Sequence, residues 1–317
     1  MDHFPYHIRQ MKIDEDAAEI AALIRVCFRP WLDECNLDFL YRLEKAGKDA
    51  AAFPLWTNLT GFPFSMEGIV CTDQSGEIIG VVSTSDFYLR ERKCSLIANV
   101  CVSPAHRGKG IAAHMLEEAA RMQRENGVYG LYLQTRTAQP GLVNFYKKRN
   151  FSVTDFRETW ILPVRRDRTS SGQNELQTGF VPREDADRFT KMLDICYPET
   201  VRWNLVFPAD LFKTGRFAYA ANQMFSRNRF LRMTDRDGRC AAWGAIQTTN
   251  ECTDVLWLLP EAETPDKVLS DALKQICEQY KGKKALKLDV PADNRSRIYA
   301  AAGFVFQQTL AWMWRPL

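Results

Sequence analysis

The sequence lacks long apolar runs and any large excess of one charge. No stretch of the 317 residues reaches the roughly 18 consecutive apolar residues that a membrane-spanning helix needs. The opening Met-Asp-His-Phe-Pro-Tyr lacks the basic and then apolar pattern of a secretory signal peptide. A formal net charge of +3 is too small to indicate a nucleic acid or an anionic membrane as partner. We therefore expect a cytoplasmic protein that binds neither nucleic acid nor membrane.

Metal-ligand spacing is also missing. The four histidines are not paired, and the nine cysteines are scattered with no Cys-x-x-Cys among them. A structural metal is therefore not expected. Most cysteines stand in apolar runs, as Cys101 and Cys277 do, which is typical of small buried thiols in a reducing compartment. With 46% hydrophobic and 26% charged residues, the chain has enough apolar material for two globular domains.

The most informative stretch is a glycine-containing turn between an apolar strand and a helix. The strand is expected at Ile97–Val102 and ends at Pro104, and the helix is expected over residues 111–126. Gly108 and Gly110 stand in the turn, where they remove Cβ atoms and permit a positive φ. The spacing therefore predicts a tight strand–turn–helix connection.

The start of that helix is a predicted anion site. Its first amides have no intrahelical partner, and together with the helix dipole they favour a phosphate or pyrophosphate. Arg107 and Lys109 add positive charge at the rim. The Gly-x-x-x-x-Gly-Lys-Ser/Thr loop is absent, and the spacing does not fit the Gly-x-Gly-x-x-Gly dinucleotide turn. The turn thus predicts a diphosphate site that belongs to neither of these two motifs.

This turn resembles the acyl-CoA site of the GCN5-related N-acetyltransferases, whose pattern is Arg/Gln-x-x-Gly-x-Gly/Ala. The matching residues are Arg107, Gly108, Lys109, Gly110, Ile111 and Ala112, and the preceding Val-x-Val-x-Pro at Val100, Val102 and Pro104 matches as well. The resemblance implies acetyl-CoA as the acyl donor, held by that turn and by the backbone amides of Val100, Cys101 and Val102. Gln139, where the family usually has Asn, is a further possible cofactor contact.

The order of expected elements supports the same resemblance. From Tyr6 to about Pro163 the chain reads strand–helix–helix–strand–strand–strand–helix–strand–helix–strand. The first helix is expected to have Asp14 as its N-cap. The implied fold is α/β (α+β), a mixed twisted sheet flanked by helices.

The rest of the chain resembles a second, diverged copy of the first. Val255–Pro260 repeats the strand that ends at Pro104, and Tyr299 repeats Tyr146, at a spacing of about 155 residues. Landmarks in register at that spacing indicate an internal duplication. We expect a catalytic domain at 1–164, a polar linker at 165–175, and a degenerate domain of the same fold at 176–317.

The second copy has lost the anion site. Pro265 removes one amide, no Gly-x-Gly is present, and Glu261, Glu263 and Asp266 place negative charge where a diphosphate would lie. Like charges at such distances cost on the order of kilocalories. The second copy should therefore not bind coenzyme A there, and serves as a scaffold, a substrate wall, or both.

The resemblance implies direct attack of an amine on the thioester. Tyr146 matches the tyrosine that protonates the departing thiolate in many relatives, four residues before Asn150, which suits a left-handed helix end. Tyr146 could instead simply pack its helix onto the sheet, since Tyr299 persists in a copy without a cofactor site.

The general base is the least defined part of the site. The strand before the glycine turn offers no carboxylate, only Asn99, which could position water or substrate. Asp86 and Glu158 are candidate bases, each also explicable as a solvated or ion-paired carboxylate. A chain of water molecules, or an amine already partly neutral, would serve equally.

The predicted function is an acetyl-CoA-dependent N-acetyltransferase acting on a small-molecule or peptide amine, as a monomer or homodimer. Two alternatives remain open: a non-catalytic acyl-CoA sensor, and a transferase of a larger acyl group. The aromatic stretch Phe53–Ser65, which could be a flap over the site or a plain core-covering loop, indicates a substrate with an apolar part.

Overall fold

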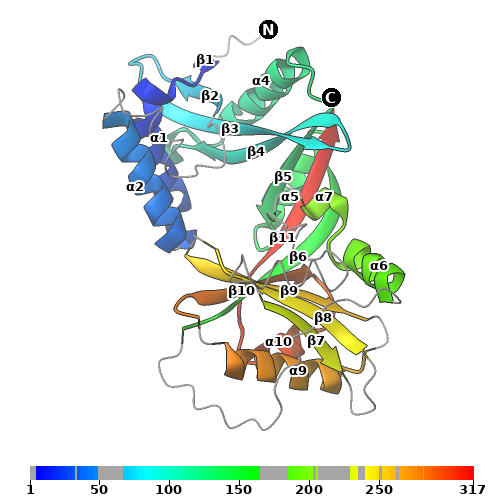
Figure 1. Ribbon diagram of the computed structural model, residues 1–317. Coiled ribbons are helices and arrows are strands. Elements are labelled where there is room, and N and C mark those ends of the chain that lie inside the picture. Colours follow the sequence, from blue (N-terminus) through cyan, green and yellow to red (C-terminus); the bar gives the residue numbers. More distant parts are fainter. Residues whose placement is uncertain are drawn as a thin grey trace. The chain divides into compact units, whose positions relative to one another are not determined.

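The computed structural model describes most of the chain (Figure 1). The described residues are 5–32, 34–48, 67–164, 185–202, 205, 229–234, 240–249, 252–261, 264–280 and 282–317. The predicted linker at 165–175, the aromatic stretch Phe53–Ser65 and Glu263 lie outside the described residues.

The chain divides into two compact units. The first comprises Met1–Gln134, Arg149–Ser152 and Met313–Leu317, and the second Thr135–Lys148 and Val153–Trp312. The division into domains at 1–164 and 176–317 stays a prediction. In chain order the elements follow the predicted series, which confirms the mixed α/β class.

Unit 1 is a mixed sheet with helices on it. Its elements are β1 (His7–Gln10), α1 (Ile13–Phe28), α2 (Glu34–Lys48), β2 (Glu67–Thr72), β3 (Ile78–Leu89), β4 (Arg92–Val102), α4 (Ile111–Glu125), the start of β5 (Gly130–Arg136) and the end of β11 (Val305–Pro316). The strand order is β1-β2-β3-β4-β5-β11. The pairs from β1 to β4 are antiparallel, and β4 and β5 are parallel.

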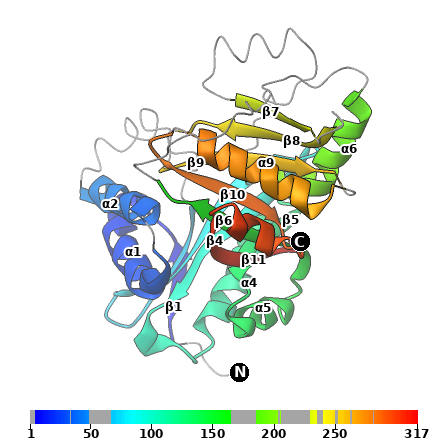
Figure 2. The same cartoon turned by 90° about the horizontal axis from the view of Figure 1, so that it is seen from below.

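Helices α1 and α4 cover opposite faces of this sheet. Val81 of β3 packs in one apolar cluster with α1 residues such as Ile24. Its neighbour Gly80 faces Met115 of α4, whose sulfur would lie 2.7 Å from a Cβ at that position. Adjacent strand residues point to opposite faces, so the sheet is covered on both sides, with α1 and α2 side by side in both views (Figures 1 and 2).

The first turn of α1 corrects one sequence prediction. Asp14 is not the N-cap, because that position is Lys12, whose side chain makes no capping bond. Asp16 instead accepts a 2.8 Å hydrogen bond from the Lys12 amide and two 2.7 Å bonds from Arg9. A buried carboxylate in the first turn of the helix, which accepts three hydrogen bonds, therefore takes the place of a side-chain cap at the N-cap position.

Unit 2 repeats the later part of the same element series. Its elements are α5 (Pro140–Lys147), β6 (Ser152–Leu162), α6 (Ala186–Cys196), α7 (Glu199–Arg202), β7 (Arg229–Thr234), β8 (Cys240–Gln247), β9 (Thr253–Pro260), α9 (Asp266–Gln279), β10 (Ala285–Pro291), α10 (Ser296–Ala301) and most of β11. The strand order is β11-β6-β10-β9-β8-β7, and β9 and β10 are parallel.

Helices α5 and α10, which carry the equivalent tyrosines Tyr146 and Tyr299, end in the same way. Asn150 follows α5 with φ +63°, as predicted, and Gly303 follows α10 with φ +95°. Both therefore occupy the backbone region that favours glycine and tolerates asparagine. The shared ending supports the duplication inferred from sequence.

The cysteines are mostly free and buried. Free thiols are Cys27, Cys71, Cys94, Cys101, Cys196 and Cys277. Cys252 is instead disulfide-bonded, so the thiol interpretation fails there. Within the described ranges no cluster of metal-binding side chains occurs, and no helix is long and apolar enough to cross a membrane.

A buried ion pair stabilises unit 2. Arg157, fully buried on β6, donates to Asp289 of β10 at 2.5 Å and to the Cys196 carbonyl at 3.0 Å. Burial alone would lower the pKa of Arg157, but Asp289, Tyr197 and Asp155 together raise it above its ordinary value. The Arg157 guanidinium thus connects β6 with β10 and with the end of α6.

We expect Asp289→Ala to lower the free energy of unfolding by about 3 to 5 kcal/mol, because it leaves Arg157 buried without its main carboxylate. The control Asp155→Ala removes a 3.3 Å contact with the same guanidinium from a side chain that is 26% exposed, and should cost less than about 1 kcal/mol. Urea unfolding of both variants measures the difference. Equal losses would contradict this role of the Arg157–Asp289 pair.

Candidate functional site

The glycine turn has the predicted strand–turn–helix form. Strand β4 ends at Val102, a short 3-10 turn spans Pro104–His106, and α4 begins at Ile111. Gly108 and Gly110 both have φ +78°, and Gly110 is the N-cap of α4. The prediction that these glycines permit a positive φ is confirmed.

The amides of the glycine turn and of the first residues of α4 have no hydrogen-bond partner in the described part of the chain. Hydrogen bonds inside the turn use the amides of His106 and Arg107, and the first bonds of the helix use those of Ala113 and His114, both to the Gly110 carbonyl. Among the described residues, no acceptor is recorded for the amides from Gly108 to Ala112. These donors are therefore available to an anion at the positive end of the helix dipole.

Space and charge around the turn suit an anion. A Cβ at Gly108 would meet nothing within 4 Å, so the backbone there is open. The first turn of α4 contains no acidic residue, and the Lys109 side chain is exposed. Arg107 donates from Nε to the Val102 carbonyl at 3.1 Å. The guanidinium is thus tethered where β4 meets the turn.

The Val102 carbonyl also accepts a hydrogen bond from a cysteine. The Cys27 thiol of α1 donates to Val102 O at 3.4 Å. The hydrogen bond with Cys101 lowers the pKa of Cys27 to about 6, burial opposes this shift, and Arg107 adds to it. The bond to Val102 O belongs to the neutral thiol, whereas the thiolate accepts from Cys101 and Arg107. Nothing in the sequence pattern marked Cys27, which reads as one more apolar position of α1.

Strand β4 contains a bulge at Asn99. Val81 pairs with Cys101 but Ser83 pairs with Ala98, so β4 has an extra residue opposite β3. Asn99 has φ +50°, and its Nδ2 donates to Ser83 Oγ at 3.2 Å. Asparagine is one of the few non-glycine residues that adopt this conformation readily. The Ser83 contact was missed by sequence reasoning, although a serine inside an apolar strand is a usable signal.

Beyond the bulge, β4 separates from β5. Their parallel ladder pairs Cys94–Leu96 with Gly130–Tyr132 and ends there. On the side of β4 that faces β3, the Ser103 amide donates to the Ile79 carbonyl. Because strand residues alternate in direction, Val102 turns its amide away from β3 and Cys101 turns its amide toward it. The register therefore favours Val102 over Cys101 as a donor to a bound molecule.

The candidate bases are engaged elsewhere. Asp86 lies opposite Ser95, at the end of β4 remote from the glycine turn, and forms a 2.9 Å ion pair with Lys93. Glu158 of unit 2 accepts hydrogen bonds from Trp160 at 2.9 Å and from Ser296 at 3.1 Å. Neither arrangement supports a role as general base.

Tyr146 and Gln139 belong to unit 2. Tyr146 is 7% exposed on α5, where its ring contacts that of Phe145 edge to face at 5.2 Å between centroids. Gln139 is the N-cap of α5 without a side-chain capping bond. Tyr299 on α10 is 1% exposed, and burial raises its pKa far above the ordinary value. The roles of Tyr146 as general acid and of Gln139 as a cofactor contact stay predictions.

The corresponding turn of the second copy is built differently. Helix α9 starts at Asp266 after an N-cap at Pro265, and Glu261 forms an ion pair with Arg188. Pro265, which has no amide hydrogen, thus occupies the N-cap position that Gly110 has in α4. That the second copy binds no diphosphate there stays a prediction.

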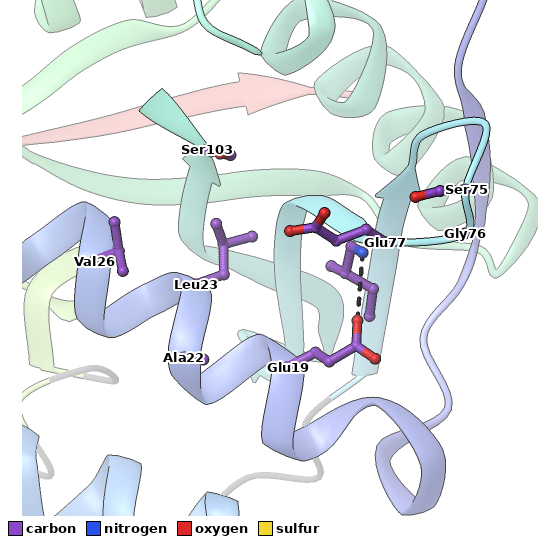
Figure 3. A pocket seen from close by; sticks show the side chains of 9 residues that line it. Glu19, Ala22, Leu23, Val26, Ser75, Gly76, Glu77 and Ser103 are labelled. Carbon is purple, nitrogen blue, oxygen red and sulfur yellow. Dashed lines mark hydrogen bonds between the residues drawn. The ribbon is translucent and has the colours of Figure 1, made fainter. Parts of the chain in front are cut away.

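A pocket of about 530 Å³ lies between α1 and the β2–β3 turn and reaches Ser103 after the end of β4 (Figure 3). It is lined by α1 residues including Glu19, by the β2–β3 turn including Glu77, and by Ser103. Glu19 accepts a 3.3 Å hydrogen bond from the Ile78 amide, drawn dashed in Figure 3. The two carboxylates disfavour an anion, so this pocket is distinct from the predicted diphosphate site.

Comparison with protein families gives one match, a model described as the acetyltransferase (GNAT) family, over residues 23–151. That range includes α4 and the whole glycine turn. No curated protein matches the chain.

Solved structures share the fold at low sequence identity. A GCN5-related N-acetyltransferase from Sphaerobacter thermophilus superposes with a TM-score of 0.58 at 15% identity, over 99% of this chain and 96% of that one. A tandem GNAT protein from the clavulanic acid biosynthesis pathway gives 0.50 at 14% identity, over 98% of both chains. A GCN5-related glucosamine N-acetyltransferase region in a fungal multi-domain β-N-acetylglucosaminidase gives 0.55 at 12% identity, over 98% of this chain and 38% of that one.

At such identities the superpositions establish the fold, whereas the family model covers the sequence of the turn itself. Residues 23–151 are therefore a domain of the acetyltransferase (GNAT) family, and the chain as a whole has the GNAT fold found in that tandem protein.

Proposed function

We propose that the chain is an N-acetyltransferase that moves the acetyl group of acetyl-CoA to a primary amine of a small molecule or peptide. The observation that carries this proposal is the set of unpaired amides from Gly108 to Ala112 at the start of α4. Six cysteines of the described residues are free and buried, which is typical of a reducing cytoplasm, whereas the disulfide of Cys252 is not.

The residues present fit coenzyme A. A diphosphate needs several convergent N–H donors, positive potential and room for its oxygens. The turn offers unpaired amides, an open backbone at Gly108 and the cations of Arg107 and Lys109. Further along the cofactor, the amide of Val102 on the open side of β4 is a donor for the pantetheine chain. When bound, acetyl-CoA supplies an activated acyl group as a thioester.

The reaction is a direct group transfer. The amine nitrogen forms a bond to the carbonyl carbon as the bond from that carbon to sulfur breaks, which yields an amide and coenzyme A. The nitrogen loses one proton and the sulfur gains one. Tyr146 is the proposed acid for the sulfur, since a phenol can protonate a thiolate when both are held close in the site.

One observation favours a second candidate, an acyl-CoA sensor without turnover. Asp86 is paired with Lys93, and Glu158 is bonded to Trp160 and Ser296. A protein that only binds coenzyme A needs no free base. Release of thiol from acetyl-CoA in the presence of primary amines, followed with a thiol reagent, distinguishes the two: release that depends on the amine supports the enzyme, and tight binding without release supports the sensor.

We expect Gly110→Glu to weaken coenzyme A binding at least about 100-fold, because a carboxylate would stand among the amides that face the diphosphate. Gly127→Glu is the matched control, since Gly127 has nearly the same φ, +73°, at the opposite end of α4. It should leave the Kd within about threefold. Isothermal titration with coenzyme A measures both, and unchanged affinity in Gly110→Glu would refute the cofactor site.

For the acid, we expect Tyr146→Phe to lower kcat by about 100-fold with little change in the Kd for acetyl-CoA, because only proton transfer to sulfur is lost. Tyr299→Phe removes the equivalent hydroxyl of the second copy and should leave kcat unchanged. Steady-state kinetics of both variants provide the test. A Tyr146→Phe enzyme with normal kcat would show that Tyr146 only packs α5.

A further inference from the structure

Two cysteine thiols of unit 1 meet next to the glycine turn. Cys27 of α1 and Cys101 of β4 belong to one buried apolar cluster, and their thiols are hydrogen-bonded to each other. The Cys27 sulfur also lies 3.4 Å from the Val102 carbonyl oxygen. Both thiols are free. Two sulfurs in such contact need only a small approach to form an S–S bond of about 2.05 Å.

Cys101 points from the sheet toward α1. It is paired with Val81 of β3, and side chains of directly paired residues point to one face. Val81 packs in one cluster with Ile24 of α1. Cys27 follows Ile24 by three positions and therefore lies on the same face of that helix. A disulfide between Cys27 and Cys101 would thus follow a contact that the fold already makes.

The neighbours of Cys27 favour its thiolate. Arg107 donates from Nε to the same Val102 carbonyl at 3.1 Å, which brings its guanidinium close to the Cys27 sulfur. The hydrogen bond with Cys101 lowers the pKa of Cys27 to about 6, and Arg107 adds to this shift, against the effect of burial. The bond with Cys27 and burial raise the pKa of Cys101. Since the thiolate is the reactive form, Cys27 is the nucleophile of the pair and Cys101 keeps its proton.

Two other buried thiols of unit 1 have a different environment. Burial raises the pKa of Cys71 on β2 to about 11. Burial also raises the pKa of Cys94 on β4, although Arg92 opposes that shift. Both thiols are protonated at neutral pH, and buried thiols of this kind are inert. Cys27 is therefore distinguished by its neighbours and not by the apolar cluster around it.

The pocket shown in Figure 3 reaches the surroundings of Cys27. It is lined by Leu23, one helical turn before Cys27 on α1, and by Ser103. Ser103 directly follows Val102, whose carbonyl the Cys27 thiol contacts. A volume of about 530 Å³ is ample for a small molecule, and the two carboxylates of the pocket disfavour an anion. The pocket thus suits the approach of a small neutral oxidant.

We propose that Cys27 and Cys101 form an oxidation site, at which a hydroperoxide converts the two thiols into a disulfide that joins α1 to β4. In the first step the Cys27 thiolate bonds to one peroxide oxygen as the O–O bond breaks, and the departing hydroxide takes up a proton from solvent. In the second step the Cys101 sulfur bonds to the Cys27 sulfur as the S–O bond of the sulfenic acid breaks. That oxygen leaves as water with the Cys101 proton. The two thiols lose two electrons in total, and hydrogen peroxide becomes two molecules of water.

The test treats the folded full-length chain with hydrogen peroxide at pH 7 and maps its peptides by mass spectrometry after the remaining thiols are blocked. Mapping by site is needed because the chain has nine cysteines. We expect a peptide cross-linked between Cys27 and Cys101, loss of the Cys27 thiol at least about tenfold faster than loss of the Cys71 thiol, and recovery of both thiols with dithiothreitol. Absence of this cross-link, or equal loss of Cys27 and Cys71, would overturn the inference.

Two variants separate the roles of the two thiols. Cys101→Ala should leave Cys27 as a sulfenic acid, which dimedone labels, and Cys27→Ala should leave the Cys101 thiol reduced. Equal dimedone labelling of Cys27 in the wild type and in Cys101→Ala would contradict the second step. The matched control Cys71→Ala removes another buried thiol of unit 1 and should leave the rate of cross-linking within about twofold.

The site goes beyond the proposed function and does not depend on it. If a variant does not fold, the cross-linked peptide of the wild type decides the question by itself. Failure of the chain to bind coenzyme A would refute the proposed function and leave the disulfide as it is. Failure to form the disulfide would refute only this inference.

Discussion

The structure of the site depends on backbone amides that the chain leaves unpaired at the start of α4. Two glycines with φ +78° make this possible, since they turn the chain from β4 into the helix without using those donors. Arg107 is tethered to Val102 O at the same corner. The bulge at Asn99 and the end of the β4–β5 ladder lie on the strand that leads into this corner.

The two copies show what this corner requires. They share the element series, and the helices of Tyr146 and Tyr299 both end in a residue with positive φ, Asn150 and Gly303. They differ where β9 meets α9, because Pro265 is the N-cap there and Glu261 forms an ion pair with Arg188. The predicted loss of anion binding in the second copy would therefore leave the fold unchanged, as is expected when a site occupies a small part of a fold. In unit 2 the buried Arg157–Asp289 pair joins β6 to β10 and takes no part in anion binding.

Local patterns in the sequence predicted most of the elements and the glycine turn, because apolar periodicity and glycine spacing are properties of neighbouring residues. Features that depend on distant residues were not predictable in this way. Asp16 replaces the expected cap at Asp14 because Arg9 of β1 lies beside it. The Asn99 bulge is visible only in the register with β3, and the Lys93 partner of Asp86 only once the hairpin is formed. Arg90 and Glu91 both have positive φ in that hairpin, although neither residue type favours it.

The most direct test of the central claim is the set of backbone ¹H–¹⁵N chemical shifts of the full-length chain during titration with coenzyme A. The account predicts that the amides from Gly108 to Ala112 shift most, in the direction of stronger hydrogen bonding, and that the residues around Pro265 do not respond. Saturable binding that leaves the Gly108–Ala112 amides unshifted would contradict it.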